Sequence, residues 1–313
     1  MIDWTIVSAR FLEFTSVLIL FGSSLFYLYA FSAGSGEPSA RRWAWPHRLL
    51  IIASIIALVS VISWLFAETV SLTGDPNDAL SLAALWSVVS DTHFGKVAFL
   101  RIVLLVCSTV TLFACPSGRA LWVMQSLLGG VVLASFAWSG HGATNEGLAG
   151  VIHLGGDVLH LLAAGVWVGA LLPLSILILH SLRTQTDPDA RLTYESLEKF
   201  SGVGIAVVSV LIVTGLINSW FLIGLAHWRS LFTTLYGISL LAKLALFGLM
   251  LLFATANRFV LSPRLGEALL RPAPQTNALR PLRASILVET TIALLVLAAV
   301  ALLGTLEPPI AVL

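Results

Sequence analysis

The sequence predicts an all-α, polytopic integral membrane protein with eight transmembrane helices, and three observations lead to this fold class. Of its 313 residues, 58% are hydrophobic and only 11% are charged, whereas a soluble domain is about half apolar and about one quarter charged. Apolar runs long enough to cross a bilayer, which takes roughly 20 residues, recur along the whole chain. The segments that connect these runs are short and rich in glycine, proline and serine. We therefore expect lipid to cover most of the apolar surface.

Eight apolar runs are each expected to form one membrane-spanning helix. They cover residues 6–32, 49–72, 97–114, 121–139, 150–179, 200–225, 234–257 and 285–306. The first run lacks the preceding basic residues and the small-residue cleavage site of a secretory signal, so it is interpreted as a span. No connecting segment is long enough for a separate soluble domain, so residues 1–313 are expected to form a single transmembrane domain.

Basic residues concentrate on every second connecting segment, which predicts the orientation of the chain in the membrane. The first, third, fifth and seventh segments hold Arg41, Arg42, Arg48, Arg119, Arg183, Arg191, Lys199, Arg258, Arg264, Arg271, Arg280 and Arg283. The alternate segments hold little more than Lys96 and Arg229. By the positive-inside rule the first set is cytoplasmic, so both termini are expected on the periplasmic side.

Composition and motifs exclude several classes of function. The formal net charge is +1 and no basic stripe with interleaved aromatic residues is present, so a nucleic-acid partner is not expected. The sequence has no GxxxxGK[ST] phosphate-binding loop, so any transport would be driven by a gradient or by a partner. Cys107 and Cys115 are eight residues apart and fit neither a CxxC metal site nor a disulfide framework.

Several charged residues fall within the predicted spans, where a charge is costly and is by default functional or paired. Arg10 and Glu13 are three residues apart on one helix face, so they are expected to form a self-compensating pair. Arg101 lies near the outer end of the third span and is expected to extend toward the lipid headgroups. Lys243 and Glu289 lie deeper, and we expect each to pair with another helix.

The fifth span carries a polar stripe. At about 100° per residue, His153, Asp157 and His160 fall within roughly 60° of one another on one helix face. His141, in the sequence Ser139-Gly140-His141-Gly142, adds a third imidazole at the outer mouth between the fourth and fifth spans. These four residues are the candidate metal ligands.

Imidazole and carboxylate groups suit Cu(II) or zinc, whereas Cu(I) favours sulfur ligands, and no methionine lies near the outer mouth. His153 and His160 are seven residues apart, or about 10 Å along the helix axis, so they cannot comfortably bind one ion. Two arrangements follow. Either the stripe holds two successive ion positions, or His141, His153 and Asp157 form a first site above His160.

A structural interpretation of the stripe stays open beside the metal site. A histidine within a span can simply hydrogen-bond to a neighbouring helix, and Asp157 can stabilise a cation such as Arg101 or Lys243. Small residues on the same span are expected to form close-packing faces for neighbouring helices. They are Gly155, Gly156, Ala163, Ala164, Gly165 and Gly169.

A further set of motifs lies in order from the third span to the eighth. They are Thr92-x-Phe94-Gly95 followed by Arg101, Ser139-Gly140-His141, Asp157-x-x-His160-x-x-Ala163-x-x-x-Trp167-x-Gly169, Thr214-Gly215-Leu216, Tyr236-Gly237-x-x-Leu240-x-x-Lys243-Leu244, Asn257-Arg258 and Glu289. With these motifs the chain resembles the copper resistance protein D family of bacterial inner-membrane proteins.

The resemblance implies a multi-pass inner-membrane protein that is not an enzyme and moves copper ions across the membrane. It also implies a partner, a small periplasmic copper carrier of the copper resistance protein C family, which would here be a separate chain. Family copper sites would fall on His141 and His160, whereas His93 matches less firmly and His153 is included on its spacing.

Two other functions stay open. Histidines within spans also bind haem, so the chain could be a haem-binding electron carrier or oxidoreductase. In that case His141 or His93 would have to oppose His160, because two axial ligands approach the iron from opposite faces. The other alternative is a structural or sensory partner that presents a metal site without transport.

Overall fold

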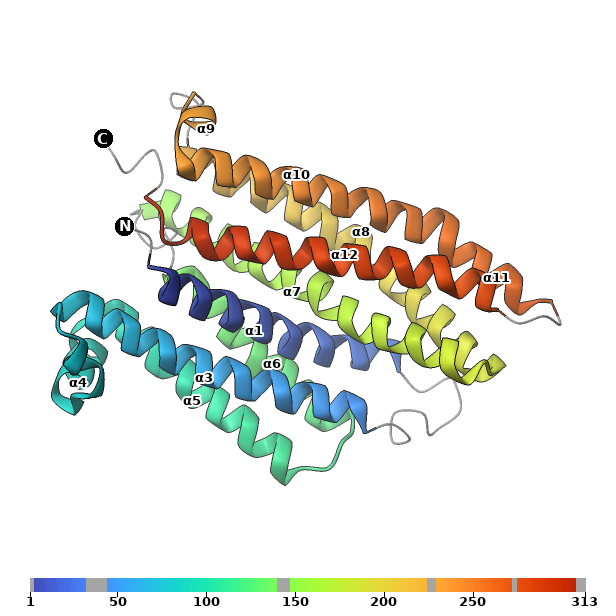
Figure 1. Cartoon of the computed structure of the whole chain (residues 1–313), viewed down its shortest axis with the longest axis horizontal. Helices are drawn as coiled ribbons and strands as arrows, with labels where there is room; N and C mark the ends of the chain where they lie inside the picture. Colours follow the sequence, from blue (N-terminus) through green and yellow to red (C-terminus); the bar gives the residue numbers. More distant parts are fainter. Residues whose placement is uncertain (1–2, 32–43, 140–146, 224–228, 272–274, 308–313) are drawn as a thin grey trace.

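The computed structural model describes residues 3–31, 44–139, 147–223, 229–271 and 275–307 of the chain. These ranges are helical with short turns, and they contain no β-strand. Eight helices are long and apolar enough to span a membrane, which confirms the predicted fold class. The first of them begins, and the last ends, at the same end of the bundle (Figure 1), as an even number of spans requires.

The elements follow one another along the chain in a simple order. They are α1 (Trp4–Ala30), α3 (Trp45–Thr73), the 3₁₀ turn η1 (Pro76–Leu80), α4 (Leu82–Asp91), α5 (His93–Ala114), α6 (Arg119–Ser135), the 3₁₀ turn η2 (Phe136–Ser139), α7 (Gly147–Thr184), α8 (Asp187–Ile223), α9 (Ser230–Thr233), α10 (Leu235–Ala256), the π-helical turn η4 (Asn257–Leu261), α11 (Ser262–Leu269) and α12 (Thr276–Leu303). Among the described residues both cysteines are free, as expected from their spacing.

The helices extend further than the apolar runs alone indicate. The segment between α3 and α5, which is rich in turn-forming residues, was expected to be a loop. It forms η1 and α4 instead, because a polar side chain caps the N-terminus of each. Asp75 accepts a hydrogen bond from the backbone N–H of Asn77, and Ser81 accepts one from Ala84. At the other end of the bundle, α7 and α8 have 38 and 37 residues, well beyond the roughly 20 that a bilayer needs.

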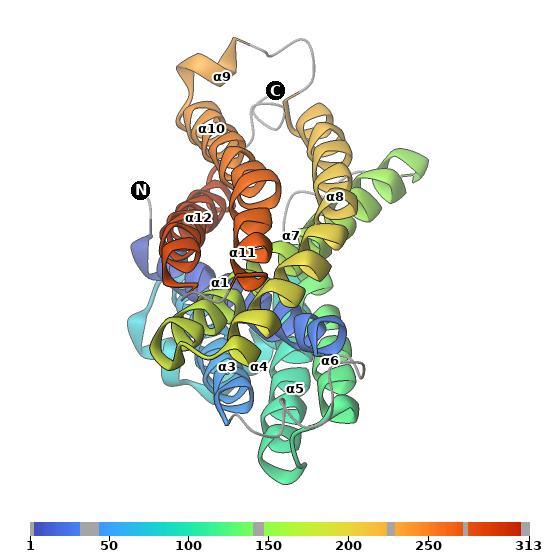
Figure 2. The ribbon, with the colours of Figure 1, turned by 90° about the vertical axis from the view of Figure 1, so that its right-hand side faces the viewer.

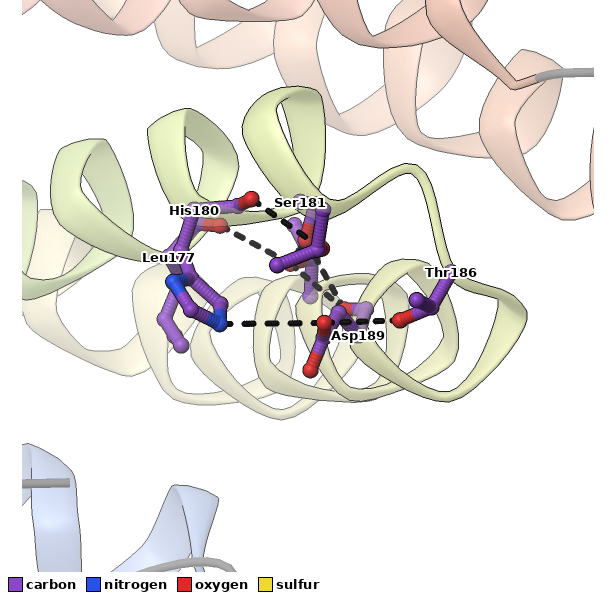
Figure 3. A network of polar contacts seen from close by, with 7 residues as sticks. Leu177, His180, Ser181, Thr186 and Asp189 are labelled. Atoms are coloured by element: carbon purple, nitrogen blue, oxygen red, sulfur yellow. Dashed lines mark hydrogen bonds and ion pairs between the residues drawn. The ribbon is translucent and has the colours of Figure 1, made fainter. Parts of the chain in front are cut away.

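A polar network at the turn between α7 and α8 fixes how the two helices lie against each other (Figure 3). The Ser181 hydroxyl donates to the backbone carbonyl of Asp189 at 2.9 Å and lies 2.7 Å from the Thr193 hydroxyl. The Asp189 carboxylate accepts a hydrogen bond from Thr186 at 2.7 Å and lies 3.7 Å from Nε2 of His180. This network sets the antiparallel register that the two helices keep along their length.

The first helix of each half of the chain, α1 and α7, cross closely at the centre of the bundle. A Cβ atom on Gly22 would overlap the carbonyl oxygen of Gly165, and one on Gly169 would overlap the carbonyl oxygen of Leu18. The Ser23 hydroxyl also donates to the Gly169 carbonyl at 2.7 Å. The predicted packing role is therefore confirmed for Gly165 and Gly169, but it is wrong for Gly155, which has open space around it.

The bundle consists of two halves with the same plan. We call α1, α3, α5 and α6 the N-terminal half, and α7, α8, α10 and α12 the C-terminal half. In each, the third span begins at a threonine that accepts a hydrogen bond from a glycine N–H three residues on. The pairs are Thr92 with Gly95 at 2.8 Å and Thr234 with Gly237 at 3.0 Å.

The halves differ in how their second and third spans meet. In the N-terminal half, α3 packs along α5, whereas α8 and α10 share no comparable interface over the described residues. Figure 2 shows α8 and α10 lying apart, with α11 close to the first part of α8. The candidate site lies in this more open half.

Candidate functional site

Each residue of the polar stripe on α7 contacts one residue of α8. His153 stacks on Phe221 with ring centroids 4.6 Å apart, Asp157 binds Asn218, and His160 binds Thr214. These three pairs, which we call the ladder, follow the register set near the turn between α7 and α8 by Ser181 and Thr193. The predicted stripe on one helix face is therefore confirmed. Its partners on α8 were not predicted.

The hydrogen bonds of His160 leave one ring nitrogen for a ligand. Nδ1 of His160 lies 2.9 Å from the Thr214 hydroxyl, and that hydroxyl donates its own hydrogen to the Val210 carbonyl at 2.6 Å. When the hydroxyl donates to Val210 it accepts from Nδ1, and in that tautomer Nδ1 carries the ring proton. Nε2 then presents a lone pair, as in many metal-binding histidines whose other nitrogen is held by a neighbour.

Asp157 lies beside one hydrogen-bond donor and one cation. Oδ1 of Asp157 accepts a hydrogen bond from the Asn218 amide at 3.0 Å. Lys243 of α10 is close enough to attract it electrostatically. The amide oxygen of Asn218 is buried and has no hydrogen-bond partner in the structure. Asp157 and Asn218 thus bring oxygen ligands to the position just above His160.

The described residues contain no ready-made metal site, that is, no group of three or more His, Cys, Asp and Glu side chains that would hold an ion. His141 and His227 lie outside the described residues, so the placement of His141 stays a prediction. His93 is exposed at the first residue of α5, a helix without an extensive interface to α7.

A negative charge lies beside His93, at the last residue of α4. The exposed Asp91 carboxylate accepts hydrogen bonds from the hydroxyls of Ser90 and Ser87, both at 2.9 Å. These two bonds, Ser90 first, hold the pKa of Asp91 below its ordinary value. This rim therefore carries a fixed negative charge near neutral pH, which favours cations.

The N-terminal half contains a second buried polar cluster, where the prediction for Arg101 was wrong and the prediction for Glu13 was incomplete. Arg101 does not extend to the headgroups. Its side chain is 0% exposed, forms an ion pair with Glu13 at 3.5 Å and binds the Ser135 and Ser139 hydroxyls. Glu13 is therefore paired across helices and not only with Arg10, whose guanidinium lies over the Trp64 ring at 4.8 Å. The local spacing of Arg10 and Glu13 could not reveal this packing.

Glu289 pairs with other helices, as expected. Its Oε1 accepts from the indole N–H of Trp167 at 2.7 Å, and its Oε2 accepts from the Asn257 amide at 2.8 Å. Sequence reasoning did not single out Trp167, Asn257, Asn218 or Thr214 for a role of their own. The available signal was an amide or hydroxyl side chain inside an apolar run.

Comparison with known proteins places the chain in a family. Residues 1–151 match the family described as "Copper resistance protein D-like, N-terminal domain", and residues 194–303 match "Copper resistance protein D". The chain belongs to the copper resistance protein D family. The first matched region covers the N-terminal half and ends at the start of α7, and the second lies within the C-terminal half. The α7 residues of the ladder lie between the two regions, whereas its α8 residues lie in the second.

Curated relatives extend over nearly the whole chain. It is 36% identical to "Copper resistance protein D" of Pseudomonas syringae pv. tomato over 96% of each chain. It is 28% identical to "Inner membrane protein YebZ" of Escherichia coli over 98% of this chain and 100% of that protein. It is also 27% identical to "Copper transport protein CutJ" of Bacillus subtilis over 79% of this chain and 45% of that longer protein. No solved structure matches the chain.

Proposed function

We propose that this protein transports copper ions across the bacterial inner membrane and receives them on its periplasmic side, with both termini facing the periplasm. Support comes from membership of the copper resistance protein D family and from relatives named for copper resistance, copper transport and the inner membrane. The basic residues on alternate connecting segments support the orientation.

The ladder is the observation that carries the proposal. It places an imidazole nitrogen of His160 and oxygens of Asp157 and Asn218 within an otherwise apolar helix pair. Asp157 and His160 are three residues apart, so they are neighbours on the α7 face and can contact one ion. His153 lies one turn closer to the outside, and His141 precedes it in the chain. Copper that enters from the periplasm would meet His141 first, then His153, and then Asp157 with His160.

Lys243 has a defined part in this proposal. A carboxylate within a membrane needs a nearby positive charge, and Lys243 supplies one to Asp157 when no metal is bound. An arriving copper ion would take over that role. In the structural interpretation of the stripe, Lys243 balances the charge of Asp157 permanently and no ion replaces it. Transport measurements distinguish this interpretation from the proposed function.

The copper donor is part of the proposal. We expect a separate periplasmic carrier of the copper resistance protein C family to deliver the ion, which rests on the family resemblance. The haem alternative would require a histidine across the iron from Nε2 of His160. Of the two candidates for that position, His93 is exposed at the start of α5, a helix without an extensive interface to α7, and His141 lies outside the described residues.

Copper uptake into liposomes containing the purified protein tests the proposal. Asp157→Asn and His160→Ala should each lower the rate about 10- to 100-fold, the range seen when groups supporting a metal site are removed. Gly155→Ala is the matched control. It lies on α7 between His153 and Asp157, and the added methyl meets open space. Normal uptake by both variants at equal protein amounts would make the ladder structural, and a Soret absorption band in the purified protein would favour haem.

A further inference from the structure

Glu289 is a buried carboxylate that is not part of the ladder and has no role in the function proposed above. It lies near the middle of α12, is 1% exposed, and is held by Trp167 of α7 and Asn257 at the start of η4. Both of its partners are neutral N–H donors. Within the described parts of the chain, no lysine, arginine or histidine forms an ion pair with it. A negative charge on this carboxylate would therefore be positioned but not neutralised by an ion pair.

Such a carboxylate needs a cation. A charge within the membrane is costly unless it is paired, and two neutral hydrogen bonds orient the group without cancelling its charge. The balance must come from a bound proton or a bound metal ion. The adjoining structure indicates which of these the site is built for.

A cavity of about 260 Å³ adjoins Glu289 between α8 and the α10–η4 segment. This is far more than the roughly 10–15 Å³ that one water molecule needs. Its mostly apolar wall includes the polar residues Asn257, Ser262 and Arg258 beside Glu289, and the guanidinium of Arg258 donates to the backbone carbonyl of Ser201. Oδ1 of Asn257 is buried and has no hydrogen-bond partner, which leaves an oxygen ligand next to the carboxylate. A proton alone would need neither this oxygen nor this space.

The backbone around Asn257 is itself unusual. Asn257 begins the π-helical turn η4, and such turns occur frequently at functional sites because they shift side chains out of the regular helical positions. Here the turn brings the amide of Asn257 onto Glu289 at 2.8 Å.

Glu289 also lies in line with the ladder. Trp167, which binds it, is seven residues beyond His160 on the same face of α7, or about 10 Å further along the axis. From the outside inward, the face of α7 therefore presents His153, Asp157, His160 and then Trp167 with Glu289. An ion that leaves His160 toward the inside would next approach this carboxylate.

We propose that Glu289 and Asn257, with the cavity beside them, form a second cation site that receives a divalent metal ion from the ladder on its way inward. The proposal rests on the function proposed above. Glu289 and Oδ1 of Asn257 are oxygen ligands, which suit Cu(II) and not Cu(I). Trp167 is a positioning residue, because its N–H holds the carboxylate and does not contact the ion.

Equilibrium binding of Cu(II) alone to the purified protein in lipid nanodiscs tests the second site. The wild type should bind Cu(II) in two events, one at the ladder and one at Glu289. Glu289→Gln should lose one event and keep the other at unchanged affinity, whereas His160→Ala should weaken the event that Glu289→Gln retains. Asn257→Ala removes the oxygen ligand while leaving the carboxylate, so it should weaken only the second event. Ser285→Ala, one turn away on α12 and also buried, is the control.

The outcomes separate the two proposals. Wild-type protein that binds and transports no copper would overturn the proposed function. Wild-type protein that binds copper, with Glu289→Gln and Asn257→Ala both unchanged in binding and in uptake, would overturn the second site alone. A Glu289→Gln protein that retains both binding events but loses the dependence of uptake on a pH gradient would identify Glu289 as a proton site, and would also overturn the inference. If Glu289→Gln does not fold, Asn257→Ala decides.

Discussion

The two halves of the molecule share a plan but treat their buried charges differently. In each half the third span begins after a threonine N-cap and carries a basic residue nine positions later, Arg101 or Lys243. The first span of each half carries an acidic residue, Glu13 or Asp157. In the N-terminal half the guanidinium of Arg101 binds Glu13 and two serines. The single ammonium group of Lys243 attracts Asp157 only electrostatically.

The inner parts of the halves show the same contrast. The N-terminal half joins α3, α5 and α6 through neutral groups, with Ser108 bound to Ser54 at 3.2 Å and to Gln125 at 2.5 Å. The C-terminal half has the carboxylate of Glu289 beside a cavity instead. The N-terminal half, whose buried acid Glu13 forms an ion pair with Arg101, can serve as a frame. The C-terminal half, with the Glu289 carboxylate beside a cavity, retains the capacity to bind an ion. We infer that the same helical plan supports both tasks.

The largest expected effect is on stability in the N-terminal half. Arg101→Met leaves Glu13 buried without its partner, and breaking a buried pair in this way costs about 3–5 kcal/mol. Replacing both, with Glu13→Leu added, should restore most of the folded protein because no uncompensated carboxylate remains. Thermal unfolding in one detergent and the yield of monodisperse protein measure this.

The corresponding double change in the C-terminal half sharpens the comparison. Asp157→Leu with Lys243→Met should also give folded protein, but it should not restore copper uptake, because the ligand is gone. If Arg101→Met folded normally and lost uptake, the N-terminal ion pair would belong to the transport path and the contrast between the halves would fail.

A smaller effect is expected at the two matched glycines. A Cβ on Gly95 would overlap the Val88 carbonyl, and one on Gly237 would overlap the Ser230 carbonyl. Each change to alanine should therefore cost about 1–3 kcal/mol through overpacking. Gly237→Ala should in addition lower uptake per folded molecule, because it displaces the start of the helix that carries Lys243. Gly248→Ala, with open space around it, is the control. Equal loss of uptake from Gly95→Ala would contradict a framing role for the first half.

The fold class could be predicted because hydropathy and span length act locally, and the stripe on α7 could be predicted because helical periodicity is fixed. The ladder partners could not, since the register of two helices of 38 and 37 residues depends on the turn at their inner end, where Gln185 takes a φ of 53°. The pairing of Glu13 with Arg101 could not be predicted either. The i, i+3 spacing of Arg10 and Glu13 indicated a partner on the same helix, whereas the packing of α1 against its neighbours also brings Arg101 to Glu13.

The smallest expected effect concerns His141, in the segment that joins the two halves, and it follows from what a nitrogen ligand requires. Imidazole binds metal only when neutral, and with an ordinary pKa of about 6.5 it competes with protons in the range found outside a bacterial cell. Copper capture should therefore weaken as the external pH falls through this range.

If His141 is the first ligand that copper meets, His141→Ala should raise the copper concentration needed for half-maximal uptake and reduce its dependence on external pH. His160→Ala should instead lower the maximal rate, because an ion without its next ligand cannot advance through apolar surroundings. A concentration series of copper uptake at two external pH values, measured for both variants, separates these effects. An unchanged apparent affinity and pH dependence in His141→Ala would show that His141 is not a ligand. The outer site would then have to be sought at His93, beside the charged Asp91 rim, or at His227, because these are the other histidines expected on the outer side.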